Sequence, residues 1–101
     1  MKEYESGIVT GTGSAITVHC GFIPDYVRVI NITDGTRVDE WFAAMDDGTS
    51  IAIVGTAGPT LNTADGITPY TGTSGGDSAG FVIGSDISTS TKKIAWIALR
   101  K

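Results

Sequence analysis

The segment Ile94-Ala95-Trp96-Ile97-Ala98-Leu99 decides the fold class of this sequence. It is apolar without a break and six residues long, which is the usual length of a β-strand and short for a helix. As a strand it would place Ile94, Trp96 and Ala98 on one face and the other three residues on the opposite face. We therefore predict a closing β-strand here.

Short β-rich segments of the same kind recur toward the N-terminus. They are Tyr4–Thr10, Ala15–Cys20, Tyr26–Asn31, Glu40–Met45, Ser50–Val54 and Phe81–Ile83. Turn-forming pairs such as Asp34-Gly35, Gly58-Pro59 and Asp65-Gly66 separate them. The pattern predicts an all-β fold, with residues 1–101 forming a single-domain β-sandwich, jelly roll or small barrel of about seven to eight short antiparallel strands.

Three further structural expectations follow from the same pattern. Residues 1–7 are expected to form an N-terminal arm that contacts a neighbour. Residues 71–80, which are almost entirely Gly, Ser and Thr, are expected to form a flexible surface loop. The predicted core consists of Ile16, Val18, Val27, Val29, Phe42, Ile51, Ile53, Phe81, Ile83, Trp96, Ile97 and Leu99.

Composition excludes several classes of protein. The 101 residues carry a net charge of −4, with one Cys and one His, so neither an internal disulfide nor a closed zinc site is expected. Seven Lys and Arg residues are too few for a nucleic-acid groove, which needs clustered cations. No apolar run is long enough for a membrane span, and the N-terminus has no apolar segment of a secretory signal. The lone Cys20 fits a protein made in a reducing cytoplasm.

Metal and cofactor sites are not predicted either. The segment Asp46-Asp47-Gly48 and Asp77 supply carboxylates, but the regularly spaced oxygen ligands of a calcium loop are missing. We interpret Asp46–Gly48 as a hairpin turn.

Two motifs are similar to catalytic sequences of proteases, but the residue spacing or order that catalysis needs is missing around them. His19 and Ser74 are similar to the base and nucleophile of chymotrypsin-like proteases, but too few residues separate them for two barrels. Asp34-Gly35-Thr36 and Asp47-Gly48-Thr49 reverse the order that an aspartic protease needs. We therefore expect no enzymatic activity.

The aromatic residues leave two alternatives open. Trp41, beside Asp39 and Glu40, and Tyr70, beside the Gly-rich loop, have the composition of a sugar-stacking site. Buried aromatic residues also dominate protein cores and subunit contacts, and we favour that interpretation.

A longer pattern resembles small tailed-bacteriophage virion structural proteins. It comprises Gly13–Val18, the Gly-Phe-x-Pro-x-Tyr-Val turn and strand at Gly21–Asn31, Trp41 with Met45, Gly80–Gly84, and the Trp96 strand. The resemblance covers most of residues 13–99. The members of this group of proteins are capsid decoration (cement) proteins or fibre-type accessory proteins.

The resemblance implies a virion protein on the outer capsid surface, made in the host cytoplasm. Its partners would be the major capsid protein and neighbouring copies of itself, with a trimer favoured. Capsid or subunit contacts are expected at Lys2, Tyr4, Glu5, Trp41, Tyr70 and Arg100. The alternative function is a receptor- or glycan-binding fibre or tail accessory domain.

Overall fold

Eight β-strands make up the regular structure of the computed structural model, which describes residues 4–56, 58–72 and 79–100. They are β1 (Tyr4–Thr10), β2 (Ile16–His19), β3 (Tyr26–Asn31), β4 (Arg37–Phe42), β5 (Thr49–Val54), β6 (Thr60–Tyr70), β7 (Gly80–Ile83) and β8 (Lys93–Leu99). No helix occurs among these described residues. The predicted all-β class is confirmed.

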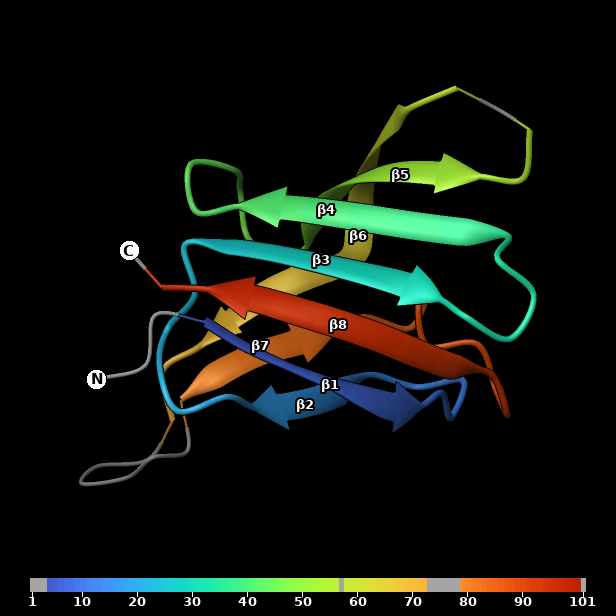
Figure 1. The fold of residues 1–101 in the computed structure, drawn as a ribbon. Helices are drawn as coiled ribbons and strands as arrows, with labels where there is room; N and C mark the ends of the chain where they lie inside the picture. The colour runs from blue at the N-terminus through green and yellow to red at the C-terminus, as the bar shows by residue number, and fades with distance from the viewer. Residues whose placement is uncertain (1–3, 57, 73–78, 101) are drawn as a thin grey trace.

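The strands form one curled antiparallel sheet. Their order is β1-β8-β3-β4-β5-β6-β7-β2, so the first two strands of the chain are its two free edges. The sheet curls into a half-barrel in which β7 and β2 lie behind β8 and β1 (Figure 1). The concave side encloses the core. The opposite side of β1, β8, β3, β4, β5 and the first residues of β6 forms the convex outside.

A bend in β6 allows the sheet to curl. Thr60–Asn62 pair with β5, whereas Ile67–Tyr70 pair with β7, and the register shifts between them. Asp65 has a positive φ of 56° at this point, and a Cβ on Gly66 would lie 2.7 Å from the Thr49 carbonyl oxygen. The Asp-Gly pair is therefore a bulge inside one long strand, and the turn predicted there is wrong.

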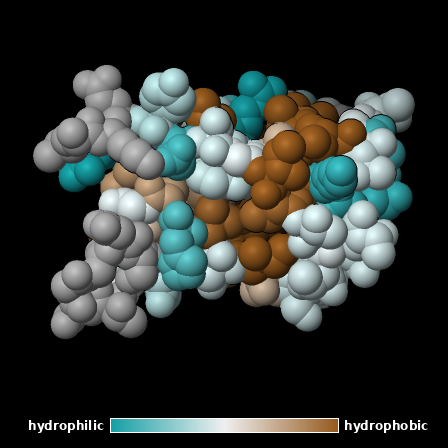
Figure 2. All heavy atoms as spheres, turned by 60° about the horizontal axis from the view of Figure 1, so that its bottom comes forward, coloured by the Kyte–Doolittle hydropathy of each residue, from teal (hydrophilic) through white to brown (hydrophobic). Residues whose placement is uncertain are grey.

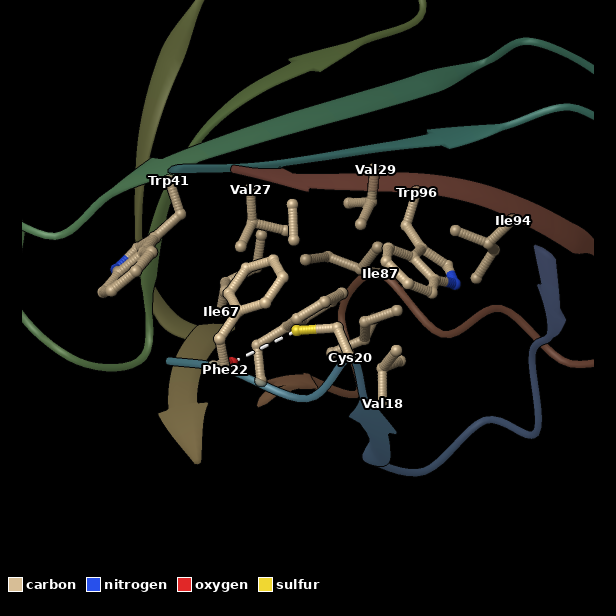
Figure 3. Packing of buried hydrophobic residues seen from close by; sticks show 13 residues of the cluster. Val18, Cys20, Phe22, Val27, Val29, Trp41, Ile67, Ile87, Ile94 and Trp96 are labelled. Atoms are coloured by element: carbon tan, nitrogen blue, oxygen red, sulfur yellow. Dashed lines mark hydrogen bonds between the residues drawn. The ribbon is translucent and has the colours of Figure 1, made fainter. Parts of the chain in front are cut away.

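The core fills the concave side of the sheet (Figure 3). Val27 and Val29 of β3 lie beside Trp96 of β8, and the indole of Trp96 meets the ring of Phe81 edge-on, with centroids 5.4 Å apart. The core prediction is confirmed for Val18, Val27, Val29, Phe81, Ile83 and Trp96, and Ile16 packs partly buried against this cluster.

Five residues predicted in the core lie on the convex face instead. Phe42, Ile53 and Leu99 are exposed, and Ile51 and Ile97 are half-buried. Their strands are apolar on both faces, and alternation alone does not say which face turns inward. This error matters for function, because an antiparallel sheet usually has one polar face.

The arm and the loop are only partly described. Tyr4–Gly7, the second part of the predicted arm, belong to β1 and pair with β8, while residues 1–3 lie outside the described residues. In the predicted loop, residues 73–78 also lie outside them.

Candidate functional site

Three rows of outward side chains cover the convex face of the sheet. Strand pairing sets the rows, because residues paired across neighbouring strands share a face. The first row is Tyr4, Leu99, Tyr26 and Phe42. The second row is Ser6, Ile97, Arg28, Glu40, Ile51 and Leu61. The third row is Ile8, Ala95, Ile30, Val38 and Ile53.

Most of these side chains are apolar, and many are open to solvent. Of the nine large hydrophobic residues exposed in the described part of the chain, six belong to these rows: Tyr4, Ile8, Phe42, Ile53, Leu61 and Leu99, each 37–61% exposed. Figure 2 brings the side of β1 and β2 forward, and apolar residues gather in a band on that side as well. Large apolar side chains exposed on several neighbouring strands of one sheet face mark an interaction surface.

A shallow hollow lies within this face, between β3 and β8. Its volume is about 210 Å³, and Arg28, Ile30, Ala95, Trp96 and Ile97 line it. Its lining is mostly apolar, and Arg28 is its one charged residue. The hollow suits an apolar side chain of a partner better than a polar ligand, which needs several converging polar groups.

The polar groups of the face are concentrated in its middle. The Tyr26 hydroxyl donates a hydrogen bond of 2.5 Å to Oε2 of Glu40. Burial of the phenol, together with this bond to a carboxylate, raises the pKa of Tyr26 to about 12. The neutral phenol therefore holds the Glu40 carboxylate in place at neutral pH.

The structure places two of the predicted contact residues at one end of this region. Tyr4 is 61% exposed in the first row and pairs with Leu99, and Arg100 follows directly, its guanidinium 5.8 Å from the centre of the Phe22 ring. Glu5 lies half-buried on the other side of β1. Lys2 lies outside the described residues.

Trp41 and Tyr70 lie away from the convex face. Trp41 is 2% exposed on the concave side, where its Nε1 donates to the Asp46 carbonyl at 3.3 Å. Tyr70 is half-buried at the end of β6, and its ring meets that of His19 edge-on at 5.6 Å. The two aromatic residues are thus not brought together as one sugar-stacking surface.

A buried polar cluster, missed in the sequence, lies on the inner side of β4 and β5. Asp39 is fully buried; its Oδ1 accepts from Nε of Arg37 at 2.6 Å, and its Oδ2 accepts from Nη2 of Arg37 and from the Ser50 hydroxyl. Asn62 extends the cluster to β6 with a 3.5 Å bond to Ser50. Every buried polar side chain among the described residues is satisfied, so the cluster joins strands and offers no free group to a substrate.

The motifs similar to catalytic sequences fall in structural positions. His19 ends β2, and Ser74 lies outside the described residues. Asp34 forms a turn in which its Oδ1 accepts from the Thr36 backbone and hydroxyl, and these bonds lower the pKa of Asp34. In the described ranges, no three His, Cys, Asp or Glu side chains are grouped to hold a metal ion. Nor does that part of the chain contain a helix long and apolar enough to cross a membrane.

Comparison with known proteins gave no match: no protein-family model, no curated protein and no solved structure matches the chain.

Proposed function

We propose that this chain is a non-enzymatic structural protein of a phage virion, a capsid decoration protein that bridges and stabilises neighbouring capsid subunits. The observation that carries the proposal is the convex face, an apolar sheet surface that a lone molecule leaves in water. Burying the six exposed side chains of that face on assembly is favourable, since each buried aliphatic or aromatic side chain contributes about 1.5–3 kcal/mol at full burial.

Such a protein acts by binding and needs no chemistry. A component that binds the assembled shell and not its dispersed subunits stabilises the shell by mass action. Many weak contacts on one particle also combine into high avidity, so each single contact area need not be large. The low charge of the chain, 18% of residues, fits a surface that is covered by neighbours.

The residues ahead of β1 are the part of the chain that we assign to the capsid subunit. They lead directly into the exposed end of the sheet at Tyr4. Removing residues 1–3 leaves every β1–β8 pair intact, whereas removing residues 1–7 would delete four of the seven residues of this edge strand. The shorter deletion therefore separates binding from folding.

Electron microscopy of virions with and without the protein tests the proposal directly. We expect density on the outer capsid surface that disappears when the protein is omitted and returns when it is added back. Virions that lack the protein should lose their contents at a lower temperature. The deletion of residues 1–3 should fail to bind while its melting temperature is unchanged. Density confined to the tail, or none at all, would contradict the proposal.

The glycan-binding alternative finds less support in the geometry. The Trp41 indole is 2% exposed and already donates its hydrogen bond to the chain, so it offers no face to a sugar ring. A glycan array decides the question: specific binding that is lost on replacing Tyr70 by Ala would favour the fibre-type function.

A further inference from the structure

The middle of the convex face carries one base and one acid on neighbouring strands. Arg28 of β3 and Glu40 of β4 are paired directly across the two strands. Tyr26 already holds the Glu40 carboxylate, and Arg28 forms no ion pair with any residue that the structure describes. Arg28 is therefore left exposed, beside an acid that is fixed in position.

The face is balanced about the line between these two residues. Strands β1, β8 and β3 lie on one side of the line, and β4, β5 and β6 lie on the other. In the second row, Ile97 of β8 and Ile51 of β5 sit at equal places on the two sides. In the third row, Ala95 and Ile30 likewise correspond to Ile53 and Val38. At the outer strands of the second row Ser6 corresponds to Leu61, and in its middle Arg28 corresponds to Glu40.

We propose that two copies of this chain pair through their convex faces, about a two-fold axis that runs parallel to the strands between β3 and β4. This axis sets Arg28 of each copy against Glu40 of the other and brings Ile97 against Ile51. The inference rests on the proposed function, because it names the neighbour that covers the apolar face.

Charge selects this axis over the other one that the sheet allows. A two-fold axis running across the strands, through the second row, would set Arg28 against its own counterpart and Glu40 against its own. Like charges across an interface are strongly unfavourable, and an unpaired charge buried there is costly as well. The axis between β3 and β4 avoids both of these costs. It gives two ion pairs, whereas Arg28 has none with any described residue of its own chain.

The size of the face indicates a reversible pair. Six strands about 4.8 Å apart span about 24 Å, and three rows two residues apart span about 13 Å, so the area between the outer Cα positions is on the order of 300 Å². Protruding side chains enlarge this area, but the curl of the sheet draws its outermost strands away from a facing copy. A standard interface buries about 800 Å² per partner, and transient ones bury less. We therefore expect a dissociation constant in the micromolar range.

Charge-swapped variants of the full chain test the pairing by sedimentation velocity, across about 1 to 300 µM. The wild type should shift from monomer to dimer over this range. Arg28→Glu gives each copy two acids at the axis, and Glu40→Arg gives two bases, so each variant alone should stay monomeric. An equimolar mixture of the two should dimerise again, because every contact across the axis then joins a base to an acid. Lys92→Glu, in an exposed ion pair with Asp34 away from this face, is the matched control and should dimerise like the wild type.

Each outcome decides the proposal. Circular dichroism and melting temperature show whether each variant folds. The result of the mixture is interpreted only when both of its variants are folded. If either variant does not fold, the single variant Phe42→Glu, at an exposed position of β4 beside the axis, takes its place and should weaken dimerisation. Dimerisation of the mixture but not of its components supports the axis. A wild type that stays monomeric, a trimer as the only assembly, or single swaps that dimerise normally would overturn it. If the protein is monomeric but still binds to virus particles, the proposed dimer is wrong and the proposed function stands. The failure of the dimer is therefore distinguishable from the failure of the proposed function.

Discussion

Replacing Asp39 by Ala should destabilise the fold more than any other single loss of charge. The carboxylate is fully buried and accepts two bonds from Arg37 and one from the Ser50 hydroxyl, all at 2.6–3.2 Å. Removing one partner of a buried ion pair costs about 3–5 kcal/mol, because the other charge is left without compensation. Since the Arg37 side chain is 20% exposed and partly reaches water, we expect about 3 kcal/mol.

Urea unfolding, followed by tryptophan fluorescence, measures this loss. A domain of this size has a free energy of unfolding of about 5–10 kcal/mol, so the variant should remain folded with a clearly lower midpoint. Asp39→Asn, which keeps one acceptor oxygen, should lose about half as much. Asp34→Ala, in an exposed turn, is the control and should unfold close to the wild type. A loss for Asp39→Ala below about 1 kcal/mol would refute the reasoning, since that is the value of a surface pair.

Four other substitutions test separate parts of the structure. Gly7→Ala should cost about 1–3 kcal/mol in urea unfolding, because the added methyl would lie 3.0 Å from the indole that packs against β1; an unchanged midpoint would contradict this close contact. Phe81→Ala should cost about 3–5 kcal/mol and Phe42→Ala clearly less when both are measured in dilute solution, because the first ring is fully buried and the second is 47% exposed. Tyr26 should give an ionisation step near pH 12 in an ultraviolet titration, since its pKa is raised to about 12, and Tyr26→Phe should remove that step. Because the folded pKa lies above the unfolded value of about 10, the stability that Tyr26 contributes is complete below pH 10 and is lost as the pH rises through 12; a step near pH 12 that persists in the variant would contradict this assignment.

The strands that the sequence predicts well are those with a simple local signal. Tyr26–Asn31 and Ile94–Leu99 were predicted within one residue of β3 and β8, because their β-branched and aromatic residues are bounded by turns. The strand β6 was missed because Asp65-Gly66 has the composition of a turn. Only the long-range pairing of β6 with both β5 and β7 makes that pair a bulge, and a local pattern does not contain such pairing.

The candidate site was missed for a related reason. Residues such as Ile97 and Phe42 look like core residues in the sequence, since a period of two shows two faces and does not say which one turns inward. The signal was nevertheless present: β8 has no polar residue on either face between Ile94 and Leu99. In an antiparallel sheet with one packed face, this composition agrees with the proposal that a partner covers the second face.

Hydroxyl-radical footprinting of the dilute protein and of its assembled form tests most directly whether the convex face is the interaction surface. The account predicts that Tyr4, Phe42 and Leu99, exposed on the isolated chain, become protected on assembly. Val54, as exposed as Phe42 but at a position of β5 that is not on this face, should react alike in both states. Unchanged reactivity of the three convex-face residues, or protection of Val54 in their place, would contradict the account.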